Sequence, residues 1–341
     1  MSLNEIKQGF KMVKGLTKAK KDRKIDLHVH YLPPDYVQAL REHDGEKPDG
    51  FATPDWTPEQ HIAFMKRLDI ATSLLSLSSP HVYFGDPAEA KRLARNVNEF
   101  GAELVERYPG KFRLLATLPL PDVDDSLAEI NYALDELHAD GFTLPTNTRG
   151  HYLGAPEMDP VFAALDERRA VVVLHPNQPG SVPDQVNEGL PIPAMEFLFD
   201  TTRTVVNMII NGTFKRFNHI KFVIPHAGAF LPLLVDRLDP FFKAIPVGER
   251  KVRTDVYAEL KRLYYDVAGF CVPRQLETLL QIADPTHLLY GSDYPYTPVI
   301  GCVSLAGMLS DTNLLTDKQR QAIFHDNALV LFPKLAGAER G

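Results

Sequence analysis

Short apolar runs recur along the chain from residue 24 onward, and longer segments with helical spacing of their apolar residues separate them. The runs are rich in Val, Ile, Leu and Phe and are bounded by turn residues, a pattern that predicts β-strands. Eight strands are predicted, at 24–30, 72–78, 112–120, 140–147, 170–175, 220–226, within 260–269 and at 287–293.

The segments between the runs place apolar residues three and four positions apart, which predicts helices. Thr57, Pro58 and Gln60 are an N-cap, a first-turn proline and a capping-box glutamine, so one helix begins there. The proline- and glycine-rich segment 31–56 is predicted to be a long loop. The predicted helices cover 57–68, 87–108, 124–139, 158–169, a segment ending near 212, 231–239, 273–283 and 316–332.

Strands that alternate with helices, several of them apolar throughout, predict a parallel sheet covered on its outside by helices. Eight strands favour an α/β fold of the closed (β/α)8 TIM-barrel type over an open doubly wound sheet. No strand is followed by G-x-G-x-x-G or by G-x-x-x-x-G-K-[ST], which argues against a nucleotide or dinucleotide site. The barrel is predicted to be one domain, residues 25–335.

Residues 1–24 form a basic N-terminal extension of different character. The extension lacks the continuous apolar core of a signal peptide. Its apolar residues fit one side of an amphipathic helix, which we expect to pack on the barrel or on a partner subunit. An arm that binds a membrane or nucleic acid is the alternative. The apolar residues concerned are Ile6, Phe10, Met12, Val13 and Leu16.

The composition narrows the class of protein. The chain has 341 residues with a net charge of −7 and a pI near 5.9, so no overall basic field draws it to nucleic acid or to an anionic membrane. Two cysteines, Cys271 and Cys302, imply no disulfide framework and fit a reducing, cytoplasmic location. No run of about 18 apolar residues is present, so no membrane-spanning helix is expected.

Histidines and one aspartate stand where predicted strands end. The carboxyl ends of barrel strands converge on one mouth, so these distant residues are expected to be neighbours. His28 and His30, two positions apart, project to the same side of their strand. Imidazole and carboxylate are ligands of borderline metals such as zinc. A metal site at the barrel mouth is therefore predicted from His28, His30, His175, His226 and Asp293.

Four stretches, IDLHVHYLPPDY, VVVLHPNQPG, VIPHAGAFLPLLVDRLD and LLYGSDYPYTP, resemble the amidohydrolase superfamily. Within it they resemble the metal-dependent decarboxylases related to aminocarboxymuconate semialdehyde decarboxylase, and DGFTLPTN and FDTTRTVVNMIINGTF resemble 6-methylsalicylate decarboxylases. This resemblance implies His28, His30, His175 and Asp293 as metal ligands. It implies His226 as the acid/base residue, with Asp293 as a second proton carrier.

Binuclear members of the superfamily bridge two metals with a carboxylated lysine at the end of strand four. Here that strand reads DGFTLPTN, without Lys or Glu at its end, so one divalent ion per chain is expected. Zinc is the expected ion because of the His-x-His pair, and manganese is the alternative. Two routes stay open, direct protonation of a ring or prior addition of water.

Aromatic side chains in the loops after the strands are expected to line a pocket for a small planar acid, or else to pack the barrel top. Trp56 is the expected lid residue. Arg203 either clamps an anion or pairs with Asp200 on its own helix. The aromatic residues are Tyr31, Phe51, Trp56, Phe230, Tyr294 and Tyr296.

Three functions fit these residues: a decarboxylase of a salicylate-type or muconate-type acid, a mononuclear hydrolase or hydratase of a lactone or unsaturated dicarboxylate, and a catalytically silent metal-binding scaffold. The aromatic loops, poor in arginine, favour the first. The resemblance also implies a homodimer in which an arginine eleven residues after the acid/base histidine, here Arg237, reaches the neighbouring site. The alternative is an exposed arginine paired with Asp236 or Asp239.

Overall fold

Parallel strands close into a barrel in the computed structural model, which describes residues 22–183, 185–248 and 253–338. Neighbouring strands pair in chain order, and the last segment returns to pair with the first. The strands are β1 (Lys24–His30), β2 (Ile70–Ser76), β3 (Phe112–Thr117), β4 (Gly141–Pro145), β7 (Val171–His175), β8 (Lys221–Ile224), β9 (Tyr264–Asp266), β10 (Leu288–Leu289) and β11 (Gly291–Tyr294).

The predicted eighth strand is divided in two, and this division closes the barrel. β10 pairs with β9 on one side, and β11 pairs with β1 on the other. Gly291 lies opposite His28 at this seam, and a Cβ on Gly291 would lie 2.6 Å from the Cβ of His28. The predicted (β/α)8 barrel is therefore confirmed, with a glycine required where its first and last strands meet.

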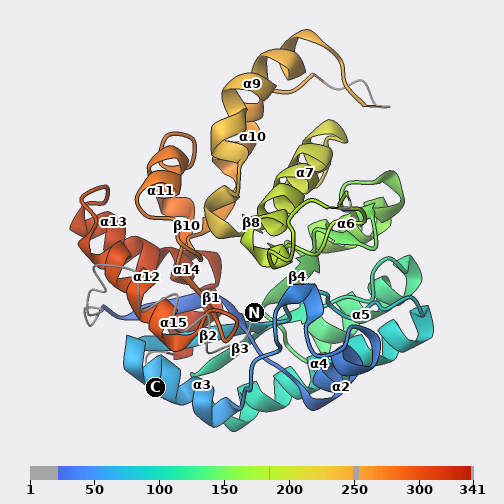
Figure 1. Ribbon diagram of the computed structural model, residues 1–341, viewed down its shortest axis with the longest axis vertical. Coiled ribbons are helices and arrows are strands. Elements are labelled where there is room, and N and C mark those ends of the chain that lie inside the picture. Colours follow the sequence, from blue (N-terminus) through green and yellow to red (C-terminus); the bar gives the residue numbers. More distant parts are fainter. Residues whose placement is uncertain (1–21, 184, 249–252, 339–341) are drawn as a thin grey trace.

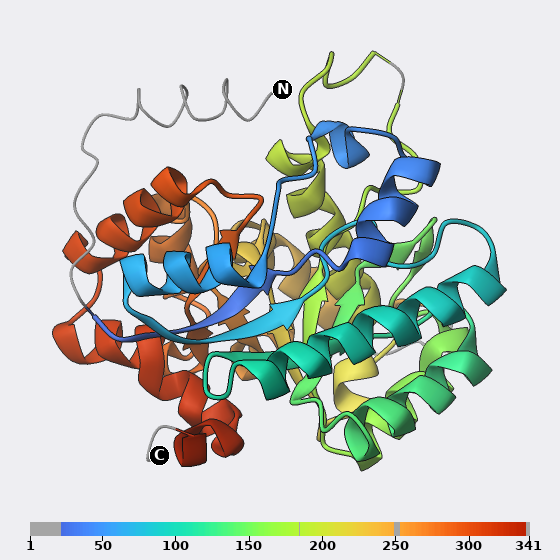
Figure 2. The ribbon, with the colours of Figure 1, turned by 90° about the horizontal axis from the view of Figure 1, so that it is seen from below.

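Helices surround the strands (Figures 1 and 2). α3 begins with the predicted capping box, in which Thr57 and Gln60 each accept a hydrogen bond from the other's backbone N–H. The helices are α2 (Pro34–His43), α3 (Pro58–Leu68), α4 (Pro87–Arg107), α5 (Val123–Asp135), α6 (Asp159–Glu167), α7 (Glu196–Ile210), α8 (Thr213–Arg216), α9 (Leu231–Ala244), α10 (Val256–Arg262), α11 (Arg274–Leu279), α12 (Val299–Asp311), α13 (Asp317–Gln321), α14 (Asn327–Leu331) and α15 (Pro333–Ala338).

Besides the short helices α8, α10 and α15, two helices of ten or more residues, α2 and α12, were not predicted. The segment 31–56 is not a loop throughout, because α2 begins at Pro34 and buries Tyr36, Ala39 and Leu40 on one side. α12 was missed because it is buried on nearly all sides, so its sequence has no alternation of polar and apolar positions.

The buried core has two parts. A large cluster lies where the strands meet the surrounding helices. A smaller one joins Ile25, Leu27 and other strand residues to side chains of 328–335. The helix expected within 1–24 falls almost wholly outside the described residues. Among the described helices, none is long and apolar enough to cross a membrane.

Candidate active site

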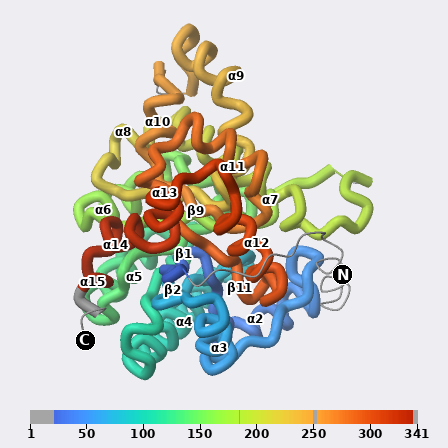
Figure 3. The backbone as a smooth tube through the Cα atoms, turned by 90° about the vertical axis from the view of Figure 1, so that its left-hand side faces the viewer, coloured from blue at the N-terminus to red at the C-terminus, as the bar shows by residue number. Residues whose placement is uncertain are grey.

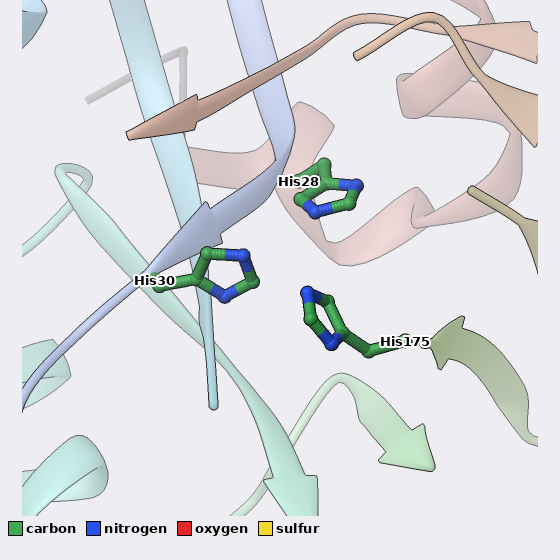
Figure 4. Close-up of side chains that lie close together, drawn as sticks. All are labelled: His28, His30 and His175. Carbon is green, nitrogen blue, oxygen red and sulfur yellow. The ribbon is translucent and has the colours of Figure 1, made fainter. Parts of the chain in front are cut away.

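Three histidine rings from opposite sides of the barrel face one another at the carboxyl ends of the strands (Figure 4). His28 and His30 come from β1 and His175 from the last position of β7. Their ring centroids lie 5.0 Å apart for His28–His30, 5.4 Å for His28–His175 and 4.8 Å for His30–His175. The predicted convergence of strand-end histidines is thus present in the folded chain.

His226 and Asp293 complete this group. The His226 ring lies 4.9 Å from that of His28, and Asp293 Oδ1 lies 3.3 Å from His30 Nε2 and 3.6 Å from His28 Nε2. Two overlapping sets are formed, His28–His30–His175 and His28–His226–Asp293, and within each set the ligand atoms lie within 4.8 Å of one another. These separations suit a single ion bound between the side chains.

The unpaired ring nitrogens indicate where such an ion fits. His28 Nε2 and His30 Nε2 are buried without a hydrogen-bond partner among the described residues. His175 donates from Nδ1 to the Pro176 carbonyl, 2.9 Å away, which leaves its Nε2 lone pair for another partner. Buried polar atoms are rarely left unpaired, so these nitrogens fit a divalent cation as their missing partner.

A carboxylate that the sequence analysis overlooked orients this group. Asp266, at the end of β9 and fully buried, accepts a hydrogen bond from His28 Nδ1 at 2.8 Å. Its other oxygen accepts from the backbone N–H of His226 at 3.0 Å and of Ala268 at 3.1 Å. Asp266 ends an apolar run, YYDVAG, so the rule that found the histidines would also have found it.

Charge is distributed unevenly across the group. Burial raises the pKa of Asp293, but the close contact with His30 and the other nearby imidazoles outweigh it, and the pKa falls to about 2. Burial, reinforced by His28, lowers the pKa of His226 to about 4. Near neutral pH the site therefore holds an anionic Asp293 and a neutral His226, a group able to accept a proton.

A cavity of about 490 Å³ opens from this group toward solvent. His175, His226 and Asp293 lie in its wall, and most of the remaining lining is apolar. No lysine or arginine of the described residues lines it. Its lining also includes Asp49, Phe51, Ser79, Pro191, Phe197, Gln275 and Tyr296.

Two segments cover the cavity. One is the short 3₁₀ turn η1 (Pro48–Gly50), and the other contains η3 (Ile192–Ala194). They approach each other closely, since a Cβ on Gly50 would lie 3.4 Å from the Pro191 Cα. Neither segment was predicted to form this roof, because the contact depends on tertiary packing rather than on local pattern.

Several aromatic residues expected at the mouth lie elsewhere. Trp56 donates to His61 Nδ1 at 3.1 Å and packs against the buried Tyr31, so it is no lid. Tyr294 stacks on Phe64 at 4.0 Å, away from the cavity. Only Phe51 and Tyr296 of the predicted aromatic residues line the cavity, and Phe197 of α7, which was not predicted, joins them.

Phe230 also lies outside the cavity lining. It stacks on Phe199 of α7, with the ring centroids 4.8 Å apart. Of the two roles considered for the predicted aromatic residues, Phe230, Tyr31, Trp56 and Tyr294 therefore have the packing role.

Arg203 pairs with Asp200, which was the alternative to its clamping of an anion. Its Nη1 lies 3.2 Å from Asp200 Oδ1 and 3.1 Å from the Tyr152 hydroxyl. Asp200 is fully buried and also accepts hydrogen bonds from Thr146 and Asn147, just beyond β4. Arg203 thus belongs to a network that fixes α7 to β4.

Arg237 lies on the exposed side of α9. The acids expected to pair with it have other partners: Asp236 accepts from the Tyr257 hydroxyl, and Asp239 pairs with Lys243 at 2.9 Å. Arg237 does not reach the cavity of its own chain.

Comparisons with known proteins agree with this architecture. The amidohydrolase family model matches residues 25–334. The 6-methylsalicylic acid decarboxylase acuB of Aspergillus aculeatus is 33% identical over 93% of this chain and 98% of its own length. A crystal structure described as an amidohydrolase II is 47% identical, with a TM-score of 0.87, covering 91% of this chain and 99% of that chain.

One of the more distant similar structures contains a bound metal ion. The manganese-bound 5-carboxyvanillate decarboxylase LigW2 of Novosphingobium aromaticivorans is 23% identical, with a TM-score of 0.82, and covers 93% of this chain and 99% of that one. At this identity the likeness shows the shared fold.

Removing the Asp266 carboxylate should weaken divalent-metal binding. In Asp266→Ala the His28 ring loses its orienting partner, and the loss of such a partner typically lowers metal affinity about 10–100-fold. Titration of chelator-stripped protein with Zn²⁺ and with Mn²⁺, in competition with a chromophoric chelator, measures the effect. Asp124→Ala, an exposed carboxylate on α5, is the matched control. Unchanged affinity in a folded Asp266→Ala protein would contradict the orienting role.

Proposed function

The chain belongs to the amidohydrolase family, and on that premise we propose that it is a metal-dependent carboxy-lyase that releases CO2 from a small aromatic carboxylic acid. The observation that carries the proposal is the group of four imidazoles and one carboxylate at the base of a largely apolar cavity. Such a cavity suits a small planar ring. Similarity to a 6-methylsalicylic acid decarboxylase over nearly the full length of both chains supports the reaction.

One divalent ion would be held by His28, His30, His175 and Asp293. Bound there, the ion supplies Lewis-acid stabilisation of negative charge and a template that orients the acid. Three imidazoles favour zinc. The manganese in the Novosphingobium relative makes manganese the second candidate.

His226 is proposed as the group that exchanges a proton with the ring. Loss of CO2 breaks the bond from the ring to the carboxyl carbon and leaves the electron pair on the ring carbon, which must take up a proton. His226 Nδ1 is buried and without a partner among the described residues, so it is free for this exchange. Its backbone is fixed at both polar atoms, the N–H on Asp266 and the carbonyl on Gln275 Nε2 at 2.6 Å.

The remaining lining would shield a bound aromatic ring from much of the solvent. Phe51, Phe197 and Tyr296 provide aromatic walls, and the roof segments shield the cavity. The absence of lysine and arginine among the described lining residues disfavours the alternative of a hydrolase or hydratase for an unsaturated dicarboxylate. Such a substrate would bring a second negative charge into a cavity of low polarity.

Purified protein supplied with zinc or manganese should release CO2 from at least one salicylate-type acid, with loss of acid equal to CO2 formed. Chelation should abolish release and metal should restore it, because the ion stabilises the developing charge. A panel of hydroxybenzoic, salicylic and muconic acids, assayed beside lactones, makes the test. Acid release from lactones without CO2 from any acid would reverse the assignment, and no turnover of either class would favour a silent scaffold.

Changes at His226 and at His175 should have separable effects. His226→Ala should lower turnover by roughly 10²-fold or more, because the proton-transfer group is lost, while one divalent ion per chain remains. His175→Ala should lose both ion and activity. Metal analysis with steady-state kinetics distinguishes the two. Near-native turnover of His226→Ala would remove it from the mechanism, and two tightly bound ions per wild-type chain would contradict a mononuclear site.

A homodimer through α9 is proposed as well. α9 and α10 extend from one side of the molecule (Figure 3). Leu233 is 64% exposed and Phe241 is 54% exposed. Arg237 lies between them at four-residue spacing, on the same side of the helix. An apolar stripe with a central arginine suits contact with a second copy of the chain. The described lining of that copy's cavity contains no lysine or arginine side chain.

If Arg237 completes the partner's site, mixed variants should complement each other. His226→Ala and Arg237→Ala homodimers should each be nearly inactive. After subunit exchange about a quarter of native activity should return, because half of the dimers are mixed and each has one intact site. Exchange is verified by native mass spectrometry. No recovery despite verified exchange, or a monomer at assay concentration, would reject the shared site.

A further inference from the structure

The cavity wall formed by η1 carries a carboxylate with no role in the mechanism above. Asp49 lines the cavity and is half-buried there. Its backbone has φ 55° and ψ 19°, in the left-handed region that aspartate and asparagine tolerate better than most residues. Pro48 before it and Gly50 after it shape this turn, so the backbone positions the Asp49 side chain.

Two hydroxyls share this wall with Asp49. Ser79 Oγ and the Tyr296 hydroxyl are both buried and make no hydrogen bond of normal geometry among the described residues. The Ser79 hydroxyl nevertheless lies near enough to Asp49 to lower the pKa of its carboxyl group. Both residues line the cavity. We call Asp49, Ser79 and Tyr296 the Asp49 patch.

The Tyr296 ring brings the Asp49 patch next to the histidines. The Tyr296 ring centroid lies 5.7 Å from that of His30 and 6.3 Å from that of Phe51, two residues after Asp49. Burial raises the pKa of Tyr296, and the carboxylates of Asp49 and Asp293 both add to the rise, as expected for a phenol between them. A small aromatic acid whose carboxyl group faces the histidines would therefore bring another part of its ring toward the patch.

The chemistry of the patch limits what it can bind. Burial raises the pKa of Asp49 to about 6, so the group is mostly ionised at neutral pH and acts as a hydrogen-bond acceptor. A buried polar group without a partner costs about 1–3 kcal/mol, which favours a ligand that supplies one. A second carboxylate would instead meet a like charge, and the described lining offers no lysine or arginine to offset it.

We propose that Asp49 determines specificity by accepting a hydrogen bond from a ring hydroxyl of the substrate and by excluding acids that carry a second carboxylate at that position. The inference rests on the proposed decarboxylase function and narrows its substrate class to hydroxylated benzoic acids. Asp49 is a binding residue in this role and takes no part in proton transfer. An alkyl group facing the patch would offer the carboxylate no hydrogen bond beyond its interaction with Ser79.

The test compares substrates on the metal-loaded enzyme. Salicylic acid, its ring-hydroxylated derivatives and its ring-carboxylated derivatives are assayed for kcat/KM. Wild-type enzyme should prefer at least one hydroxylated derivative to salicylic acid by 10-fold or more, since a site built to bind a hydroxyl discriminates strongly against its absence. It should turn over the carboxylated derivative at that position poorly.

Two variants keep the left-handed turn. Asp49→Gly removes the carboxylate with no backbone penalty and should reduce the hydroxyl preference by 10-fold or more, chiefly through KM. Asp49→Asn keeps the size of the side chain and should relax the discrimination against the carboxylated acid by about 10-fold, because the like charge is gone. Asp55→Gly and Asp55→Asn change an exposed carboxylate outside the cavity lining and serve as matched controls.

A binding measurement separates this inference from the function on which it rests. Calorimetry compares resorcinol and catechol with phenol as ligands of the metal-loaded protein. If no acid releases CO2 but Asp49→Gly loses a wild-type preference for the dihydroxy ligand, the proposed function fails and the Asp49 patch stands. An equal preference in wild type and Asp49→Gly, whether in turnover or in binding, overturns the inference, as does the absence of any hydroxyl preference in wild type.

Discussion

The buried carboxylate of Asp266 is the constraint on which the rest of the site depends. It binds His28 of β1 through one oxygen and the backbone of residue 226, after β8, through the other. Burial disfavours its charge, but the interaction with His28 more than compensates and keeps the pKa of Asp266 below its ordinary value. One anion therefore fixes both the ring orientation of His28, the proposed ligand, and the position of His226, the proposed proton-transfer group, so that metal binding and proton exchange would share a single support.

The parts of the site that lie on strands were predictable, because strand ends converge in a barrel and side chains two apart share a face. His28, His30 and His175 follow these rules. His226 and Asp293 were predicted too, as residues at strand ends, but the positions of the aromatic residues in the loops that follow were not. Asp293 adopts φ 59°, so the alternation of the strand does not continue beyond it. Tyr294 then packs on Phe64, while Tyr296 returns to the cavity. No local pattern in the sequence indicates the turn that sends these two tyrosines to different places.

The helices show the same limit in another form. α3 and α4 carry capping residues and a one-sided apolar pattern, and their bounds were predicted to within one or two residues. α2 was hidden by the proline and glycine that surround it. Arg203 shows why a charged residue near a mouth is ambiguous from sequence alone. Arg203 is held away from the cavity by Asp200, and the burial of Asp200 beside the end of β4 depends on tertiary packing.

Gly50 and Pro191 meet where the two roof segments touch, and the separation between these segments is limited by a residue without a side chain. The four histidines lie on strands or just after them, whereas the roof consists of two loop segments that meet at a contact of their own. A substitution at that contact would change the volume above the histidines without replacing any of the proposed metal ligands. Such an arrangement gives both evolution and the protein engineer a short route to acids of different size, since the reactive centre need not be rebuilt for each.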